Sequence, residues 1–404
     1  MKGVVMLSEK YLERYADVLM WGLKTARSGR FKKGDIVVLR GDPAAMALAE
    51  TVYGRILDLG MNPVVRVGGT PGMERMFYQK AGSKQLTFIP PGEDVFNKAV
   101  NGSVYFHAPE SLTHLAGVDP ARIAKAAVAR KPLRDIIMRR EDQGLFGWTL
   151  CAVPTECQAR HAGLTLDQYE RQVIRACYLD SSDPVADWKD VYRRAGAIKR
   201  WLNKMEVKAY HVESENSDLT VTPGEKRKWI GISGHNIPSF ELFLSPDWHG
   251  VSGVYYADQP SFRSGNLVEG VRLEFNKGVV VKLESAAGEK FAKSQLSMDK
   301  GASRVGEFSL TDTRFSRIDK FMANTLYDEN FGGSYGNCHI ALGASYSDTY
   351  DGDPSELTAV KKKSLGFNDS ALHWDLVNTE DKTVTAVLKD GSRKIIYQNG
   401  KFFR

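Results

Sequence analysis

Cysteine is scarce in this sequence of 404 residues, and none of its four cysteines is paired with another as C-x-x-C. This spacing excludes a recognisable zinc knuckle or disulfide framework, so we interpret the thiols as buried or incidental. Long hydrophobic runs are also lacking, because no window approaches the roughly 18 apolar residues of a membrane-spanning helix. The first 22 residues carry Glu9 and Glu13 instead of the hydrophobic core of a signal peptide. We therefore expect no membrane segment and a cytoplasmic location.

A strong excess of charge of one sign is missing as well. The chain has 55 Lys and Arg residues against 49 Asp and Glu residues, mostly interleaved, and its net charge is +6. Nucleic-acid binding favours a clustered basic stripe with aromatic partners, whereas the dense basic runs here are confined to 131–140 and 361–363. We interpret those runs as solvated surface charge and expect no nucleic-acid partner. The turns at 41–43 and 68–72 contain glycine but lack the remaining residues of a phosphate-binding loop.

The first half of the chain alternates helical and strand-like segments. A helical pattern over about residues 10–28 precedes a strand at 35–40, and the alternation continues to the strand WTLCAV at 148–153. This rhythm predicts a mostly parallel α/β sheet. From about residue 187 the sequence becomes strand-rich, and the turns Asn276-Lys277-Gly278, Asp390-Gly391 and Asn399-Gly400 indicate hairpins.

We predict two domains from this change of pattern. The first, over residues 1–186, is an α/β domain with a mostly parallel sheet. The second, over residues 187–404, is an α+β domain rich in antiparallel strands, and it carries the metal site described next.

All strong candidates for metal ligands fall in the second half. If the segment ALHWDL is a strand, its histidine and aspartate share one side, because alternate residues of a strand face the same way. Two glutamates lie inside apolar runs, where an unpaired carboxylate costs several kcal/mol unless it is bound to a cation. Three carboxylates and two imidazoles on separate segments therefore predict a shared cation site, formed by Glu241, Glu307, His339, His373 and Asp375.

The number of these side chains predicts two ions. One zinc or iron ion is satisfied by three or four protein ligands, so the surplus favours two divalent ions about 3.5 to 4 Å apart. Such a pair lowers the pKa of a water molecule toward neutrality and polarises a substrate carbonyl, as amide hydrolysis requires. One ion could also take the free amino group of a peptide.

Two other functions stay open at this point. A mononuclear iron dioxygenase acting on a dihydroxylated ring needs only two histidines and one carboxylate, which leaves Glu241 and Glu307 unexplained. A metal-stabilised scaffold that binds peptides without turnover typically uses cysteine ligands. Cys338 is the one cysteine near the set, and on a strand it would face away from its neighbour His339.

The motifs NIPSFELFLSP, VGEFSL, TLYDENFGGSYGNCHIALGASY and NDSALHWDL, in this order, resemble the thermophilic aminopeptidase T family of metallo-aminopeptidases across nearly the whole chain. The resemblance implies that the family's metal ligands fall on the five residues above and that its active-site tyrosine falls on Tyr346. It also implies a two-metal exopeptidase of broad specificity that acts on peptide substrates and is activated by zinc, cobalt or manganese. Finally, it implies a homodimer whose active sites open into an internal cavity.

Several residues around the set receive individual interpretations. Tyr346 is expected to be a metal ligand or a donor to the developing oxyanion. Glu307 is our choice for the general base, with Glu241 second. Glu329 is left out of the ligand set, because the DEN segment is equally suited to capping a helix or holding the metal loop by hydrogen bonds. Phe240 stands where the family usually has a small or polar residue, and we expect it to narrow or reshape the pocket.

The sequence gives less indication that the other six histidines bind a metal or a substrate. His235 and His249 flank the Glu241 segment and could touch substrate, although histidines in loops are usually just exposed. The remaining four have no carboxylate at ligand spacing and are assigned no role: His107, His114, His161 and His211.

Overall fold

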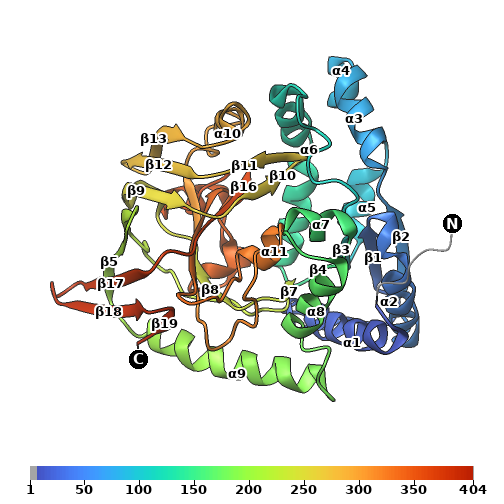
Figure 1. The fold of residues 1–404 in the computed structure, drawn as a ribbon, viewed down its shortest axis with the longest axis horizontal. Coiled ribbons are helices and arrows are strands. Elements are labelled where there is room, and N and C mark those ends of the chain that lie inside the picture. The colour runs from blue at the N-terminus through green and yellow to red at the C-terminus, as the bar shows by residue number, and fades with distance from the viewer. Residues whose placement is uncertain (1–6, 404) are drawn as a thin grey trace.

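A parallel β-sheet forms one side of the molecule in the computed structural model, which describes residues 7–403 (Figure 1). Its strand order is β2-β1-β3-β4-β7, and every neighbouring pair is parallel. The strands are β1 (Ile36–Gly41), β2 (Asn62–Val67), β3 (Gly102–His107), β4 (Gly147–Ala152) and β7 (Asn236–Ile237). The predicted parallel sheet of the first half is therefore confirmed, and residues 236–237 of the second half add one further strand at its edge.

Helices of the first half pack against this sheet, α1 on β3, β4 and β7 and α2 on β1 and β2. The helical pattern expected over about 10–28 forms α1, which begins at Glu9 and ends at Thr25. The helices are α1 (Glu9–Thr25), α2 (Met46–Asp58), α3 (Pro71–Lys80), α4 (Ser83–Leu86), α5 (Glu93–Ala99), α6 (Pro120–Asp142), α7 (Glu156–His161), α8 (Leu166–Ala176) and α9 (Pro184–Leu202). In α9, Pro184 occupies the first helical position and the Asp183 side chain accepts a hydrogen bond from Ala186 N, so the sequence itself starts the helix.

The rest of the chain is mainly antiparallel. An eight-stranded sheet has the order β13-β12-β9-β6-β5-β17-β18-β19, and a four-stranded sheet has the order β16-β15-β14-β8. The strands of the larger sheet are β5 (Val207–Ser214), β6 (Asp218–Val221), β9 (Val251–Ala257), β12 (Val271–Asn276), β13 (Val279–Glu284), β17 (Lys382–Leu388), β18 (Arg393–Gln398) and β19 (Lys401–Phe402). The smaller sheet contains β8 (Glu241–Leu244), β14 (Val305–Thr311), β15 (Asn337–Gly343) and β16 (His373–Asn378).

Short elements connect these strands. The strands β10 (Ser261–Arg263) and β11 (Asn266–Val268) form a hairpin. The short helices are α10 (Glu289–Leu296), α11 (Thr325–Asp328) and α12 (Ala359–Ser364), and the 3₁₀ turns are η1 (Pro43–Ala45), η2 (Trp248–Gly250), η3 (Ser347–Thr349) and η4 (Pro354–Glu356). The predicted hairpin turns are confirmed: Gly278, Gly391 and Gly400 have φ of 79°, 87° and 71°, which glycine adopts without strain.

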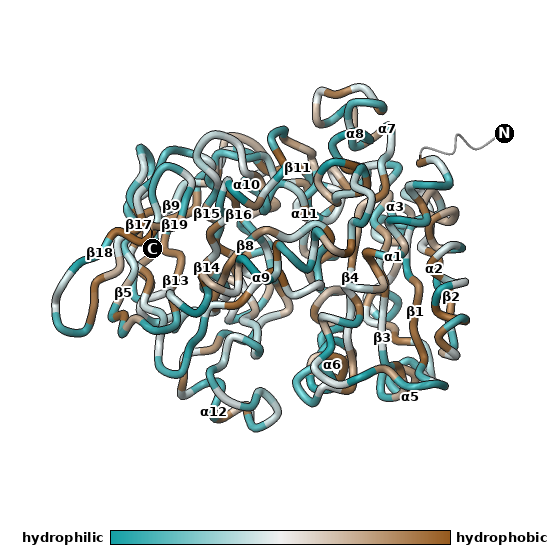
Figure 2. Tube along the Cα trace, turned by 90° about the horizontal axis from the view of Figure 1, so that it is seen from below, coloured by the Kyte–Doolittle hydropathy of each residue, from teal (hydrophilic) through white to brown (hydrophobic). Residues whose placement is uncertain are grey.

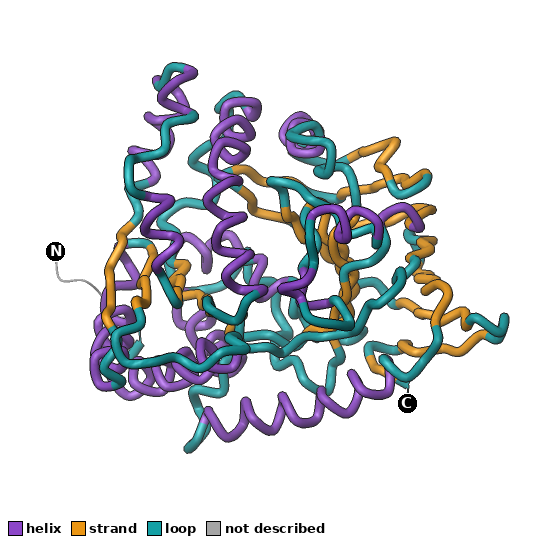
Figure 3. Tube along the Cα trace, turned by 180° about the vertical axis from the view of Figure 1, so that it is seen from behind, coloured by secondary structure: helices purple, strands orange, loops and turns teal. Residues whose placement is uncertain are grey.

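The two sides of the molecule share one hydrophobic core. Figure 3 shows helices gathered around the parallel sheet and strands dominating the other side, and Figure 2 shows hydrophobic segments along the inner strands with largely hydrophilic peripheral loops. Trp188 of α9 stacks on Trp21 of α1 and on Phe240, with ring centroids 5.9 and 5.4 Å apart. This aromatic stack packs the start of β8 against the helices of the parallel sheet. Among the described residues, no helix is long and apolar enough to cross a membrane.

The four-stranded sheet lies inside the molecule. Every residue of β14 and β15 is buried, so both faces of these strands are covered. A β-bulge shifts the register between Val305 and Glu307, and a Cβ on the intervening Gly306 would lie 2.3 Å from the Ala344 carbonyl oxygen. Only glycine fits this approach, so a local sequence feature positions Glu307 on the sheet. The mixed fold of parallel and antiparallel sheets is thus confirmed, whereas the boundary near residue 186 stays a prediction.

Candidate functional site

The five predicted ligand residues come together on one face of the four-stranded sheet. In the strand register, Ser309 pairs with His339, Glu307 with Ala341, and Ala341 in turn with Asp375. Because alternate residues of a strand face the same side and neighbouring strands lie about 4.8 Å apart, these odd-numbered positions share one surface. The small side chain of Ala341, between the two acids, leaves space at the centre of the group.

The side chains of the group approach each other closely. His339 Nε2 lies 3.2 Å from both Glu241 Oε2 and Glu307 Oε1 and 4.0 Å from Asp375 Oδ1. His373 Nε2 lies 3.4 Å from Asp375 Oδ1 and 3.7 Å from Glu307 Oε2. The two oxygens of Glu307 therefore face two different imidazoles, and Glu241, Glu307 and His339 have the spacing of a metal-binding group.

Neighbouring hydrogen bonds orient these side chains. Ser309 Oγ donates to Glu241 Oε2 at 2.9 Å, and Nδ1 of His373 lies 3.0 Å from the carbonyl oxygen of Ala344. Asn330 Oδ1 accepts the backbone N–H groups of Phe240 and Glu241, at 2.6 and 3.1 Å. Such outer contacts fix the rotamer and the basicity of metal ligands. Nδ1 of His339 is buried without a partner among the described residues.

Burial and mutual charge shift the titration of the group. The pKa of Glu307 is raised to about 7, because burial and the charge of Glu241 raise it more than His339 and His373 lower it. Burial would also raise the pKa of Asp375, but the positive charges of His373, His339 and Arg263 outweigh burial and lower that pKa to about 2. Burial disfavours charge on His339, yet its contacts with Glu241 and Glu307 raise the pKa of the imidazole well above its usual value. Strong shifts of this kind are typical of functional sites.

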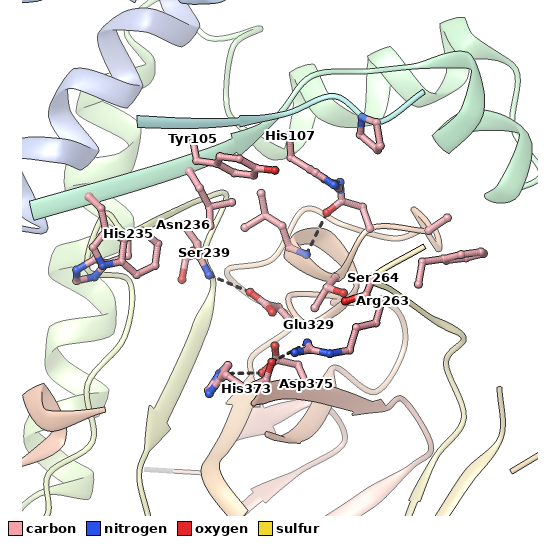
Figure 4. A pocket seen from close by; sticks show the side chains of 18 of the residues that line it. Tyr105, His107, His235, Asn236, Ser239, Arg263, Ser264, Glu329, His373 and Asp375 are labelled. Atoms are coloured by element: carbon pink, nitrogen blue, oxygen red, sulfur yellow. Dashed lines mark hydrogen bonds and ion pairs between the residues drawn. The ribbon is translucent and has the colours of Figure 1, made fainter. Parts of the chain in front are cut away.

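A cavity of about 600 Å³ opens beside the group. Glu241, Glu307, His373 and Asp375 line one wall of it. Residues of the parallel sheet line the opposite wall, with Tyr105 and His107 at the carboxyl end of β3 and with His235 and Asn236 at the start of β7 (Figure 4). Trp148 of β4 lines the cavity as well. The sequence motifs did not predict the residues of this wall. A signal was present, because Asp42 and His107 lie at the carboxyl ends of predicted parallel strands, where α/β proteins bind ligands.

Tyr346 also lines the cavity. Its ring packs edge-on against His373 with centroids 4.7 Å apart, and its backbone N–H donates to Ser245 Oγ at 2.8 Å. Burial raises the pKa of the Tyr346 phenol well above its ordinary value, and the acids Glu307, Asp375, Glu329 and Glu141 raise it further. The phenol therefore stays protonated and can act as a hydrogen-bond donor in the cavity.

Phe240 does not shape this pocket, contrary to the expectation from the sequence. Its side chain is fully buried in the stack with Trp188, and it is absent from the described residues that line the cavity. The neighbouring Ser239 and Glu241 line the cavity instead. Alternation along the strand explains the difference, since successive side chains point to opposite faces.

The DEN segment holds its loop by hydrogen bonds, one of the two expected roles, and it also enters the cavity. Asp328 holds the loop, because its carboxylate accepts the backbone N–H groups of Met322 and Asn324 at 2.7 and 2.8 Å. Glu329 lines the cavity beside the five residues. Burial raises the pKa of Glu329 well above its ordinary value, and the charges of Asp375, Glu241 and Glu307 raise it further.

Three of the other histidines line the cavity: His107, His114 and His235. His235 Nε2 lies 2.9 Å from Glu141 Oε1, and His114 Nε2 lies 2.7 Å from Glu74 Oε2. The sequence assigns no role to His107 and His114, because their polar partners, Asn324 and Glu74, come from distant parts of the chain that sequence spacing cannot reveal. His249 pairs with the nearby Asp247 outside this cavity.

Comparison with known proteins gives matches along the whole chain. The sequence model of a family described as thermophilic metalloprotease (M29) matches residues 8–402. Aminopeptidase T of Thermus aquaticus is 29% identical over 306 residues, which cover 71% of this chain and 73% of that protein. Aminopeptidase PepS of Streptococcus thermophilus is 29% identical over 414 residues, covering 96% and 97% of the two chains. The solved structure of wild-type AmpT from Thermus thermophilus superposes with a TM-score of 0.77 at 21% identity, covering 98% of this chain and 100% of that one.

Proposed function

The chain belongs to the thermophilic metalloprotease family (M29), and from this premise we propose that it removes N-terminal residues from peptides with the help of two divalent metal ions. The predicted resemblance to the aminopeptidase T family is confirmed, and so is the assignment to the metallo-aminopeptidases, a class of hydrolases. One observation carries the proposal: five carboxylate and imidazole side chains meet on one sheet face beside a cavity of about 600 Å³.

The chemistry of the donor set supports divalent cations as cofactors. Eight carboxylates line the cavity, and Arg263 is the one Lys or Arg among its described lining residues. So many acids in a buried place need positive charge nearby. Imidazole nitrogen and carboxylate oxygen are ligands that zinc, cobalt and manganese accept. We therefore assign the ligand role to the five predicted residues, which belong to the second predicted domain.

The arrangement around Glu307 supports two ions over one. Its Oε1 faces His339, which also contacts Glu241, while its Oε2 faces His373, which also contacts Asp375. The five donors thus fall into two groups that share one carboxylate. Two ions about 3.5 to 4 Å apart would use both groups, whereas one ion would leave donors without a cation.

The mechanism assigns roles to individual side chains. The metal ions, when bound, supply Lewis acidity that makes a water molecule nucleophilic and polarises the scissile carbonyl. We assign the proton transfer from the attacking water to the leaving amine to Glu307, because it lines the cavity and its pKa is raised to about 7. Glu241 is the second choice for this role. The Tyr346 phenol, which keeps its proton, donates to the oxyanion that develops on the carbonyl oxygen.

The test combines a metal count with a substrate panel. Elemental analysis of the purified protein is expected to give two zinc, cobalt or manganese ions per chain. The same preparation should cleave amino-acid p-nitroanilides and dipeptides, and EDTA should abolish this activity until metal is restored. One ion per chain would contradict the two-metal mechanism, and full activity of metal-free protein would contradict the proposal altogether.

Family membership does not favour the two alternatives, a ring-cleaving dioxygenase and a non-catalytic scaffold. From the family resemblance we also propose a homodimer, which light scattering would reveal as twice the chain mass. A cytoplasmic location and a domain boundary near residue 186 remain predictions.

A further inference from the structure

Glu329 is a buried carboxylate that projects into the cavity, and no Lys, Arg or His of residues 7–403 forms an ion pair with it. Glu329 is 7% exposed, and it lines the cavity together with four of the proposed metal ligands. In Figure 4 its side chain lies between Asn236 on one side and Asp375 on the other. A carboxylate in such a place is unfavourable unless it meets a cation.

The partners of Glu329 are neutral amides. Asn236 Nδ2 donates to Glu329 Oε1 at 2.9 Å, and Asn330 Nδ2 lies 3.4 Å from the same oxygen. No described residue donates a hydrogen bond to Oε2 of Glu329. Oδ1 of Asn236 is likewise buried without a described partner. Oε2 of Glu329 is thus an acceptor atom available in the cavity to a ligand with N–H donors, whereas Asn236 Oδ1 is covered by protein.

The segment that carries Glu329 is held in place. The Asp328 carboxylate accepts hydrogen bonds from the backbone N–H groups of Met322 and Asn324. Asn330 Oδ1 accepts one from the backbone N–H of Glu241. The backbone carbonyl of Glu329 itself accepts a hydrogen bond from Thr311 Oγ1 at 3.3 Å. Its side chain is therefore presented by a rigid support that is linked directly to the proposed metal ligands.

We propose that Glu329, oriented by Asn236, binds the α-ammonium group of the peptide substrate. This inference rests on the proposed aminopeptidase function and specifies how the enzyme recognises a free N-terminus. In an α-amino acid residue the ammonium nitrogen is two bonds from the scissile carbonyl carbon, so its anchor must lie close to the reacting centre. Glu329 meets this requirement, because it lines the same cavity as Glu241 and Asp375 and lies beside Asp375 in Figure 4. Its neighbour Asn330 accepts the backbone N–H of Glu241 at 3.1 Å.

Other acids of the cavity are already engaged. Glu74 pairs with His114 at 2.7 Å and Glu141 with His235 at 2.9 Å, whereas the Asp42 carboxylate accepts the backbone N–H of Ala108 at 2.7 Å. Asp348 has an unpartnered oxygen, but the charges that act on it are those of His235 and Glu141, toward the far wall. An internal peptide bond, with a neutral N–H in place of an ammonium group, would leave Glu329 without a counter-charge, which favours cleavage at the N-terminus.

The test compares two ligands that differ only in the amino group. Leucine hydroxamate and 4-methylpentanoyl hydroxamate both chelate divalent metals, and their dissociation constants are measured by calorimetry on the zinc-loaded enzyme. In the unaltered protein the amino ligand should bind roughly ten- to hundredfold more tightly, as for a hydrogen bond to a charged group. In E329Q this preference should fall to about threefold or less, with the zinc content per chain unchanged.

A matched control is E74Q, which alters a cavity acid that is paired with His114 and should keep the preference within about twofold. An unchanged preference in E329Q would overturn the inference, because the amine would then bind elsewhere, for example on a metal ion. Loss of zinc from E329Q would also overturn it, by making Glu329 a ligand. If E329Q does not fold, N236A is measured in the same way, and an unchanged preference there has the same consequence.

The proposed function and this inference fail in different ways. A zinc-loaded protein that cleaves no aminoacyl p-nitroanilide and binds neither hydroxamate would contradict the aminopeptidase proposal. A protein that cleaves these substrates but binds both hydroxamates equally would contradict the role of Glu329 alone.

Discussion

Glu307 Oε1 and His339 Nε2 lie 3.2 Å apart although 32 positions separate them in the chain. The antiparallel pairing of β14 and β15 produces this contact, with the bulge at Gly306 setting which residues face it. A buried carboxylate and a buried imidazole at this distance are a favourable pair for a divalent cation, and the predictions below follow from their surroundings.

Removal of the metal ions should destabilise the protein. Without cations the buried acids around Glu307 repel each other, and ligands that bind only the folded chain stabilise it by mass action, about 2.7 kcal/mol at a free concentration of 100 Kd. Differential scanning calorimetry after EDTA treatment should show a melting temperature several degrees lower, restored by zinc. An unchanged melting temperature would indicate that no ion is bound at this site.

Replacement of Glu307 by Gln should remove the proton acceptor. We expect kcat on leucine p-nitroanilide to fall at least about 100-fold, the scale of general base catalysis. The free energy of unfolding of the metal-free variant should not decrease, because the substitution removes a buried charge whose pKa is raised to about 7. If Glu307→Ala leaves hydrolysis intact while the stability collapses, a structural role for the site would be the better explanation.

Ser309→Ala tests the support of the metal centre. The hydroxyl of Ser309 donates to Glu241 Oε2 at 2.9 Å, and loss of such a contact typically weakens metal affinity about 10- to 100-fold. Competition with a fluorescent zinc chelator measures the effect. Ser239→Ala is the matched control: Ser239 lines the same cavity, and none of its described hydrogen bonds reaches the five residues. Equal zinc affinities of the two variants would contradict the proposed ligand role of Glu241.

Phe240→Ala should affect stability and leave substrate preference unchanged. The ring is fully buried against Trp188, and truncation of a buried phenylalanine costs about 3–5 kcal/mol. Urea denaturation measures this loss. The order of kcat/KM over a panel of aminoacyl p-nitroanilides should be that of the unaltered protein. A changed order of kcat/KM among the substrates would show that Phe240 does shape the pocket.

Lys382→Met should stabilise the protein below about pH 8. Lys382 is 2% exposed, its Nζ has no described partner, and burial lowers the pKa of its ammonium group to about 8. An unfolded lysine titrates near 10.4, so between these values the unfolded chain binds the extra proton and stability rises with pH. The gain from the substitution, up to about 3 kcal/mol at pH 7, should therefore fade toward pH 10.

Chemical denaturation at pH 7 and pH 10 checks this prediction. Lys389→Met, at an exposed position of the same hairpin, is the control and should change the free energy of unfolding by less than about 0.5 kcal/mol. A gain that grows with pH would show that the Lys382 ammonium stabilises the folded chain.

Local chemistry made much of the fold predictable. The alternation of helix and strand in the first half indicated the parallel sheet, and glycines such as Gly278 marked hairpins because they tolerate positive φ. The candidate ligands were visible because acids inside apolar runs, such as Glu307, demand a cation. The predicted orientation of Phe240 is wrong, since the sequence does not reveal that β8 begins at Glu241 and hence which neighbouring side chains face the core.

The far wall of the cavity could not be found in the same way. His107 and His235 belong to segments far from the ligand motifs, and each has its polar partner on another element. No spacing rule connects such residues, because only the tertiary arrangement of the two sheets brings them to one cavity.

The sequence by itself determined the kinds of donor, the strands that carry them and the turns between those strands, since these depend on properties of neighbouring residues. Only the tertiary structure decided that Glu307 lies between two imidazoles, that Glu329 enters the cavity and that the ends of the parallel strands close it. The physical reason is that contacts between distant segments are set by strand register and core packing, which short-range patterns do not specify.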